Sequence, residues 1–158
     1  MGLFVVRHAK AGQRAQWDGD DLHRPLSASG RKQADALAQR LAPERPSGLY
    51  ASPYVRCAQT LEPLGTLVGL DVMPDERLTE GAPFEAALEL LDEVADRSVL
   101  CSHGDVIPEL IGALTRRGMR VEGPPDWRKA TIWVLHRGDD EITRAAAEPP
   151  PGATPHDN

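Results

Sequence analysis

Short runs of apolar residues alternate along the chain with longer stretches in which apolar residues recur at helical spacing. The short runs occupy residues 3–6, 49–52, 98–101 and 131–135, and a polar cluster follows the first of them. Apolar runs of this length, bounded by polar residues, are typical of buried strands. The pattern therefore predicts four strands, and a further strand-like segment precedes Glu80.

The stretches between these runs predict four helices. Ser27 is placed to cap the first, because its hydroxyl can accept a hydrogen bond from a free backbone N–H. Pro53 suits the first position of the second helix, and Pro63 is expected to end or kink that helix after position 61 or 62. Gly118 lies where a glycine commonly follows the fourth helix. The apolar positions that define the first, third and fourth helices are Ala34, Leu37, Ala38 and Leu41; Phe84, Ala87, Leu88, Leu91, Val94 and Ala95; and Ile107, Leu110, Ile111 and Leu114.

Strands that alternate with helices predict an α/β fold of three layers, with a mostly parallel central sheet flanked by helices. We expect one domain over residues 1–146, because the chain has 158 residues and contains no repeat or interior linker. Residues 147–158 hold several prolines among small and polar residues. Such a segment buries too little apolar surface to offset its ordering entropy, so a disordered Pro-rich tail is expected there.

Composition narrows the class of protein and its partners. Apolar residues make up 41% of the chain and the net charge is −6, which argues against nucleic acid as a partner. The N-terminal apolar run is far too short for a signal peptide or a membrane span, so we expect a cytoplasmic protein without membrane contact. Cys57 and Cys101 are too few for a disulfide framework, and we expect two reduced thiols.

Residues that can bind phosphate follow three of the predicted strands. Arg7 and His8 follow the first run, Ser52 ends the second with Arg56 about one helical turn later, and His103 follows the third. Ligands of an open parallel sheet bind beyond the carboxyl ends of its strands. The topology therefore predicts that two imidazoles and two guanidiniums meet at one edge of a protein that is acidic overall.

These residue types, gathered in one place, suit phosphoryl transfer. Arg7 and Arg56 would hold the phosphoryl oxygens, helped by N–H groups at helix starts. A neutral His8 could accept the phosphoryl group as a nucleophile, and His103 would donate to the same oxygens. Taken singly, a strand-end histidine is often structural and an isolated arginine is usually a surface charge. A metal site on both histidines lacks an acidic partner at ligand spacing. We expect surface positions for the other histidines, His23, His136 and His156.

Four segments in this order resemble the motifs of the histidine phosphatase superfamily. Arg7-His8-Ala9 resembles its signature, usually written RHG, and residues 26–34 resemble the entry to its first helix. Residues 52–60 resemble its Ser-Pro…Arg…Gln-Thr segment, and Ser102-His103-Gly104 resembles its second catalytic histidine. The order and spacing of all four segments agree with the superfamily. Together they span residues 3–136, so the resemblance covers most of the chain.

Two short groups of the superfamily are the most similar: the bacterial phosphohistidine phosphatases and the phosphatase domain fused to Nudix hydrolases. Residues 7–12 and 127–131 look most like the latter. The motif begins at residue 7 with no Nudix domain before it, so the resemblance suggests a separate Nudix hydrolase in the same pathway. Ala9 stands where the usual signature has glycine, and alanine is common there in the short groups.

The resemblance implies a phosphoglycerate mutase-like fold and a phosphohistidine intermediate on His8. Arg7, Arg56 and His103 would complete the catalytic pocket, and Glu80 is the best positional match for the general acid. The rivals of Glu80 are carboxylates in the loop after the first strand, Asp18, Asp20 and Asp21. Further substrate contacts are expected from Ser52, and from three residues that could equally be ordinary surface residues, Lys10, Gln13 and Lys129.

The implied activity is hydrolysis of a phosphate monoester, a phosphoramidate or a phosphoanhydride. The substrate would be a phosphorylated small molecule, a nucleotide or a phosphohistidine protein, and no cofactor and no metal are implied. A phosphoglycerate mutase-like phosphotransferase is one alternative, although 158 residues leave no room for the large insertions that close over a sugar phosphate. A non-catalytic module that binds a phosphorylated ligand is the other, and the intact set of four pocket residues argues against it.

Overall fold

The computed structural model describes residues 1–153 and leaves residues 154–158 outside that description. Within the described part, one sheet contains the strands β1 (Gly2–Arg7), β2 (Leu49–Ala51), β3 (Val72–Pro74), β4 (Val99–Ser102), β5 (Arg120–Val121), β6 (Ile132–Gly138) and β7 (Glu141–Glu148). The α-helices are α1 (Ala28–Leu41), α2 (Val55–Val68), α3 (Phe84–Glu93) and α4 (Val106–Arg116). Single 3₁₀ turns form η1 (Arg14–Gln16), η2 (Asp21–His23), η3 (Ala42–Glu44) and η4 (Glu76–Leu78).

The sheet is mostly parallel, as the sequence predicts. Its strand order is β3-β2-β4-β1-β6-β7-β5, and β3, β2, β4 and β1 run in one direction. β6 is antiparallel to both β1 and β7, so it alone among the described strands runs the other way. The sequence pattern missed β5 and β7. β7 contains three consecutive alanines between charged residues and gains its pairing from the hairpin with β6.

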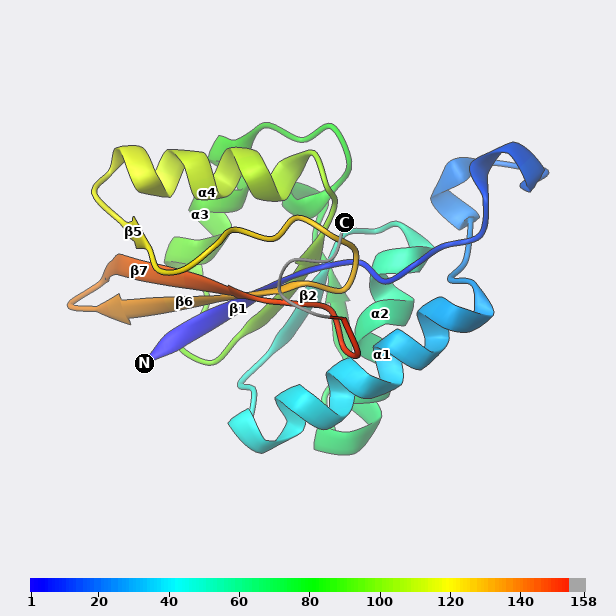
Figure 1. Ribbon diagram of the computed structural model, residues 1–158, viewed down its shortest axis with the longest axis horizontal. Helices are drawn as coiled ribbons and strands as arrows, with labels where there is room; N and C mark the ends of the chain where they lie inside the picture. Colours follow the sequence, from blue (N-terminus) through cyan, green and yellow to red (C-terminus); the bar gives the residue numbers. More distant parts are fainter. Residues whose placement is uncertain (154–158) are drawn as a thin grey trace.

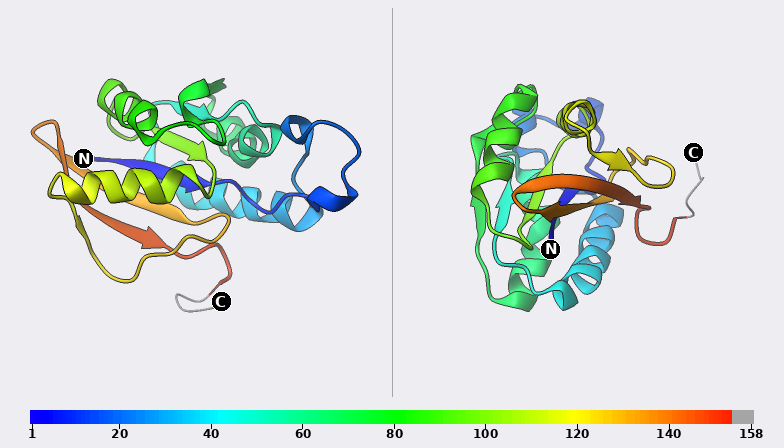
Figure 2. Two further views of the ribbon diagram at one scale, coloured as in Figure 1. Left: turned by 90° about the horizontal axis from the view of Figure 1, so that it is seen from above. Right: turned by 90° about the vertical axis from the view of Figure 1, so that its left-hand side faces the viewer.

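Helices cover both faces of the sheet, which confirms the three-layer prediction. Leu3 and Val5 of β1 pack in one cluster with the buried residues of α3 and α4. Phe4 and Val6 point the other way and pack with those of α1 and α2. Figure 1 shows α3 and α4 above the sheet and α1 and α2 below it, and the end-on view in Figure 2 separates the same layers. The alternation of a single strand thus divides the core into two halves.

The helix boundaries confirm some sequence predictions and correct others. The Ser27 hydroxyl caps α1 by accepting the Gly30 N–H, and Gly118 follows α4 with a φ of +108°. α3 ends at Glu93, because Val94 has an extended backbone, so Val94 and Ala95 are not helical. The ends of a helix are the part that a sequence pattern locates least accurately.

The second helix differs from the prediction at both of its prolines. α2 begins two residues after Pro53, because Tyr54 has an extended backbone. It also continues through Pro63. Pro63 lacks an N–H and its ring crowds the carbonyl four residues earlier, which costs about 3 kcal/mol. Leu61 and Leu64, both buried, anchor the helix to the core on either side of Pro63, and this packing outweighs the local cost.

The C-terminal boundary also needs correction. β7 extends through Glu148, so Ala147 and Glu148 pair with β6 rather than belonging to a tail. Arg40 of α1 forms an ion pair with Glu148, which fixes the end of this strand to a helix. The last part of the predicted tail, residues 154–158, including His156, lies outside the described residues. Among the described residues, no helix is both long and apolar enough to cross a membrane, and Cys57 and Cys101 are buried free thiols.

Candidate active site

Strand pairing brings the two predicted histidines together. β1 and β4 lie side by side, with Arg7 opposite Ser102, so the residues that follow them leave the sheet at one edge. The rings of His8 and His103 are 5.4 Å apart between centroids and meet edge to face. β2 pairs with the other side of β4 and brings Ser52 to the same edge. The convergence expected from the order of strands is therefore present.

His8 is held as a neutral imidazole with one free nitrogen. Its side chain is buried, and Nδ1 donates to the carbonyl of Ala9 at 2.8 Å. Burial lowers the pKa of His8 to about 3, and the charges of Arg56 and Arg7 add to the effect. The hydrogen bond fixes the proton on Nδ1, so Nε2 carries a lone pair at neutral pH. A nitrogen in this state can act as a nucleophile.

In His103 it is Nε2, rather than Nδ1, that has a hydrogen-bond partner within residues 1–153. Nε2 lies 2.8 Å from the hydroxyl oxygen of Ser52, and that oxygen also accepts the Tyr54 N–H at 3.3 Å. We assign the Ser52 hydroxyl as the donor to Nε2, which places the ring proton of His103 on Nδ1. Nδ1 is buried and has no hydrogen-bond partner among the described residues. Ser52 thus orients His103.

Both predicted arginines reach the same place from different elements. Arg7 is the last residue of β1, and its guanidinium is packed against Gly104, where an added Cβ would lie 2.6 Å from Cζ. Arg56, in the first turn of α2, is almost fully buried and lies 4.7 Å above the Tyr54 ring. Burial lowers the pKa of Arg7, although Asp105 opposes that change. A guanidinium remains protonated at neutral pH despite such a shift.

Three buried donor atoms of this site lack a partner within the described part of the chain. They are Nε of Arg7, Nε of Arg56 and Nδ1 of His103. Leaving a buried donor unsatisfied costs about 1–3 kcal/mol, and native proteins rarely retain several in one place. All three belong to residues selected from the sequence as phosphate ligands. The donors are therefore arranged for an acceptor that has several oxygens.

Carboxylates from two loops approach the site. Asp21 Oδ2 and Glu80 Oε1 lie 3.2 and 3.5 Å from the same nitrogen of Arg56, Nη2. Arg24 donates to Asp21 at 2.8 Å. Burial alone would raise the pKa of Asp21, but the Arg24 hydrogen bond and the charges of Arg56, Arg24 and Arg14 lower it below its usual value. Asp21 therefore resembles a permanent anion more than a proton donor.

The other sequence candidates lie farther out. Asp18 is exposed, and Asp20 caps η2 by accepting the Leu22 N–H. Gln13 is exposed and precedes η1. The side chains of two more candidates, Lys10 and Lys129, are also exposed. Of the loop carboxylates, only Asp21 joins Glu80 as a contact of Arg56 within the described residues.

Lys129 nevertheless belongs to the electrostatic surroundings of the site. The next residue, Ala130, donates its N–H to the carbonyl of Arg7 at 3.0 Å. Burial lowers the pKa of Lys129, and the positive charges of Arg7, Arg24 and Lys10 lower it further. The segment that carries Lys129 is therefore fastened to the strand end that carries the site.

Sequence reasoning missed three contributors, Arg14, Arg24 and Tyr54. Arg14 lies 3.6 Å from Asp21 and 3.7 Å from Glu80, and Arg24 is buried beneath the loop. Nothing in the local pattern distinguishes these arginines from surface charges. Tyr54 lies 4.8 Å from the His103 ring, and its position directly after Ser-Pro was the one available signal.

A metal centre is not among the arrangements found. Within residues 1–153, no group of three or more His, Cys, Asp or Glu side chains is placed to hold a metal ion. The acids nearest His8 and His103 are engaged by arginines, with Asp21 bonded to Arg24 and Arg56. The arginines and the histidines are thus the groups positioned to meet an anion.

The structure is that of an α/β protein whose paired histidines and arginines gather at the carboxyl edge of its sheet. Residues 3–87 match the histidine phosphatase superfamily (branch 1), and this segment is more than half of the chain. The chain belongs to the histidine phosphatase superfamily. The family assignment made from the four sequence motifs is therefore confirmed.

One curated relative and two solved structures illustrate the similarity. The chain is 39% identical over 155 residues to a Mycolicibacterium smegmatis protein named 8-oxo-(d)GTP phosphatase. The match covers 94% of this chain and 48% of the relative, so the chain spans about half the length of that protein.

The solved structures establish the fold. The protein histidine phosphatase SixA, complexed with tungstate, superposes with a TM-score of 0.73 at 21% identity over 94% of each chain. A mycobacterial glucosyl-3-phosphoglycerate phosphatase complexed with VO3 gives 0.70 at 23% identity, covering 93% of this chain and 97% of the other. The predicted fold class is confirmed by these superpositions.

Proposed function

We propose that the protein is a phosphatase that transfers a phosphoryl group to His8 and then releases it to water. The observation that carries this proposal is the set of unpartnered buried donors on Arg7, Arg56 and His103 beside the neutral imidazole of His8. A phosphoryl group offers several oxygens to such donors and a phosphorus atom to the free nitrogen. Membership of the histidine phosphatase superfamily supports the same activity.

In the first step, Nε2 of His8 bonds to phosphorus while the bond from phosphorus to the leaving group breaks. Arg7, Arg56 and Nδ1–H of His103 donate to the non-bridging oxygens, where negative charge is concentrated. The neutral state of His8 matters here, because a protonated imidazole has no lone pair for phosphorus. Burial and the nearby guanidinium charges maintain that state.

In the second step, water attacks the phosphohistidine and the P–N bond breaks, so that phosphate leaves and His8 regains its lone pair. One carboxylate near Arg56, Glu80 or Asp21, would accept a proton from that water. Burial raises the pKa of Asp21, but its contacts with Arg24, Arg56 and Arg14 lower it by more and keep the carboxylate ionised. Asp21 is consequently poorly suited to act as an acid for the leaving group.

A test of the activity is release of p-nitrophenol from p-nitrophenyl phosphate. His8→Ala and Arg56→Ala should each lower turnover by at least about 10²-fold, the scale lost when a transition-state charge donor is removed. His136→Ala, which removes an imidazole from the far end of β6, and Arg120→Ala on β5 are matched controls that should retain the parent rate. Near-normal turnover in either site variant would contradict the proposal.

The intermediate can be detected independently of the rate. Rapid acid-free quenching followed by peptide mass spectrometry should find phosphate on His8 in the parent. A parent protein that binds vanadate but releases no phosphate from any substrate would instead be a phosphate-binding module. Transfer of the phosphoryl group to a second organic acceptor rather than water would identify a phosphotransferase.

The leaving group is the part of the substrate that the donors around His8 do not specify. The mycobacterial relative is named for a nucleotide, and SixA is named as a protein histidine phosphatase. We therefore propose a screen with a phosphohistidine peptide, nucleoside di- and triphosphates and sugar phosphates. The substrate with the highest kcat/KM would distinguish these classes.

A further inference from the structure

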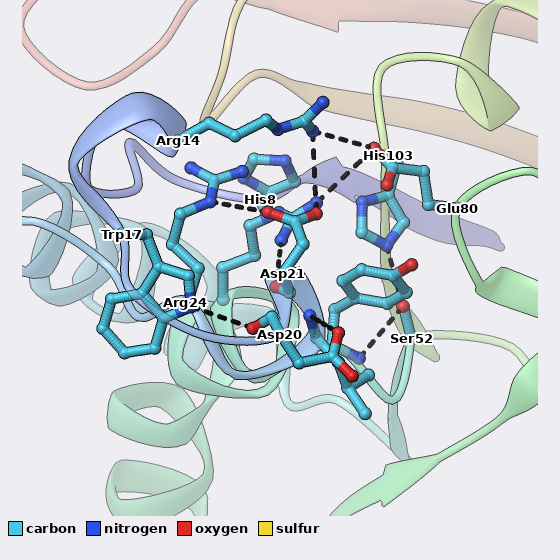
Figure 3. Close-up of polar contacts among 12 residues, drawn as sticks. His8, Arg14, Trp17, Asp20, Asp21, Arg24, Ser52, Glu80 and His103 are labelled. Atoms are coloured by element: carbon cyan, nitrogen blue, oxygen red, sulfur yellow. Dashed lines mark hydrogen bonds and ion pairs between the residues drawn. The ribbon is translucent and has the colours of Figure 1, made fainter.

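A second group of positive charges lies beside the phosphoryl site. Asp21 is held among three arginines: its carboxylate is 2.8 Å from Arg24, 3.2 Å from Arg56 and 3.6 Å from Arg14. Figure 3 shows Arg24 and Arg14 reaching the carboxylate from either side, in front of His8. An anion in this position therefore touches Arg56 of the phosphoryl site and two arginines outside it.

The side chain of Asp21 is less anchored than the arginines it meets. It is partly exposed, whereas Arg56 is buried in α2 and Arg24 is buried and also donates to the carbonyl of Gly12. The backbone of Asp21 is fixed, because its carbonyl accepts from Nη1 of Arg56 at 3.1 Å. A bound anion could thus replace the carboxylate by a rotation of the Asp21 side chain, while Arg24 and Arg56 stay in place.

Two lysines extend the positive surroundings. Lys129 experiences the charges of Arg7, Arg24, Lys10 and Arg56 together, which places all of these cations in one electrostatic region. The carboxylates that face this region are Asp20, Asp21, Glu80 and Asp105. Cations outnumber these acids, even though the whole chain carries a net charge of −6. When a bound anion displaces the Asp21 carboxylate, the contacts of that carboxylate with Arg14 and Arg24 become available to the anion.

We propose that Arg14, Arg24 and Lys129 form a second anion subsite next to the phosphoryl site, and that the substrate is a phosphoanhydride with a second phosphate following the transferred one. This inference rests on the proposed function, because it assigns the leaving group of that reaction. The Asp21 carboxylate occupies the subsite in the free protein. The second phosphate displaces it and takes over its contacts with Arg14 and Arg24.

The leaving group of a phosphoanhydride suits the acids present. Nε2 of His8 bonds to the terminal phosphorus, the bond from that phosphorus to the bridging oxygen breaks, and the electron pair leaves on the inner phosphate. Water then hydrolyses the phosphohistidine to orthophosphate, with one proton released overall. An inner phosphate needs little protonation as it departs, whereas an alkoxide needs a strong acid. The arginine contacts of Asp21 disfavour such an acid at that residue.

The second subsite also separates this class from phosphohistidine proteins. A phosphohistidine side chain has an equally good leaving group, but it presents an imidazole rather than an anion beyond the transferred phosphorus. Arg14 and Arg24 would then keep the Asp21 carboxylate as their partner and gain no contact with the substrate. A diphosphate, by contrast, complements these charges directly.

The test compares selectivity rather than absolute rate. The ratio of kcat/KM for ADP to kcat/KM for p-nitrophenyl phosphate is measured in the parent, in Arg14→Gln and in Lys129→Gln. Each substitution should lower this ratio by about tenfold, since a charge-assisted contact contributes about 1.5–3 kcal/mol. Arg120→Gln, an exposed cation on β5, is the control and should leave the ratio unchanged.

Binding supplies a second measurement that requires no turnover of the anhydride. Inorganic pyrophosphate should inhibit p-nitrophenyl phosphate hydrolysis more strongly than orthophosphate does. Arg14→Gln should weaken inhibition by pyrophosphate, whereas Asp21→Asn, which removes the internal competitor, should strengthen it several-fold. Opposite effects of these two substitutions would not follow from a general loss of structure.

The outcomes distinguish the two proposals. If His8-dependent hydrolysis of p-nitrophenyl phosphate is found but the ratio is unaffected by either substitution, the second subsite is refuted and the phosphatase remains. A parent that prefers a phosphohistidine peptide to ADP would also overturn the subsite. If hydrolysis of every substrate is absent or does not depend on His8, the proposed function itself fails.

Discussion

His8 illustrates how the surroundings of one residue determine its chemistry. Its Nδ1 donates to the carbonyl of the next residue, so the backbone of the signature loop itself sets the tautomer. Burial and the neighbouring guanidiniums then lower the pKa to about 3 and keep the ring neutral. The charged groups that would hold a substrate phosphate thus also keep the nucleophile deprotonated.

The low pKa of His8 has a consequence for stability. The unfolded chain takes up a proton on this residue near its ordinary pKa of 6.5, while the folded protein does so only near pH 3. Between these values the unfolded state binds more protons, so the free energy of unfolding falls as the pH is lowered. The contribution of His8 is therefore fully present above pH 6.5 and is lost toward pH 3.

Urea unfolding of the parent and of His8→Gln would measure this contribution. From about pH 7 to about pH 4, the parent should lose about 3 kcal/mol more stability than the variant, at 1.36 kcal/mol per pKa unit. Comparison with the variant cancels the titration of carboxylates elsewhere in the chain. Parallel pH dependence in the two proteins would show that His8 titrates near its ordinary pKa.

Gly104 is a second residue whose role is local and testable. A Cβ there would lie 2.6–2.9 Å from the guanidinium atoms of Arg7, which form the far end of a flexible side chain. Gly104→Ala should therefore displace Arg7 while leaving the fold intact. We expect kcat/KM to fall by at least about tenfold, because a transition-state donor is moved. The accompanying change in unfolding free energy should be below about 1 kcal/mol.

The measurement pairs steady-state kinetics with thermal unfolding of the same variant. Gly112→Ala, in the middle of α4, is a matched control, because its Cβ would meet only the tip of Arg116 at 3.4 Å. Full activity in Gly104→Ala would show that Arg7 does not need its present position.

At the scale of elements, the sequence predicted which residues gather at the edge of the sheet, because strand order alone brings them together. β1, β2 and β4 are neighbours, and each is followed by a residue selected from the sequence: His8, Ser52 and His103. Their apolar runs were readable because each strand is buried on both faces. β7 was unreadable for the opposite reason, since its alanines and charges are typical of neither a strand nor a loop.

The parts of the site that escaped prediction depend on loops. Arg14, Arg24 and Asp21 meet through two single 3₁₀ turns between β1 and α1, a stretch that carries no hydrophobic period. Figure 1 shows this segment projecting beyond the end of the sheet. Which of three aspartates would face Arg56 was undecided in the sequence, because loop geometry rather than spacing selects Asp21.

Pro63 offers a test of how packing overrides local preference in α2. Replacing it with alanine restores a backbone N–H and removes the ring that crowds the preceding turn. We expect Pro63→Ala to raise the free energy of unfolding by about 1–3 kcal/mol, with part of the gain offset by a more flexible unfolded chain. Activity should be unchanged, because Arg56 lies in the first turn of α2, before Pro63. Denaturant unfolding would measure the change, and a lower midpoint would show that Pro63 itself stabilises the helix.

At the scale of the whole molecule, charge is distributed unevenly. The chain carries a net charge of −6, yet Arg7, Arg56 and the cations near Asp21 gather at one end of the sheet. An anionic substrate is therefore repelled by the molecule at long range and attracted by the site at short range. Whether the repulsion or the attraction controls the rate at which the substrate reaches the site depends on how far each electrostatic field extends.

Salt provides the measurement that separates these fields. Raising the ionic strength from about 0.01 M to about 1 M shortens the screening length from about 30 Å to about 3 Å. If the local cations dominate, kcat/KM for p-nitrophenyl phosphate should fall by roughly tenfold or more across this range, while kcat, measured after binding, changes little. An inert chloride salt is suitable, because sulfate and phosphate would compete for the site. A rise in kcat/KM with salt would mean that the acidic surface controls approach, and that the positive charge acts only once the substrate is within a few ångströms of His8.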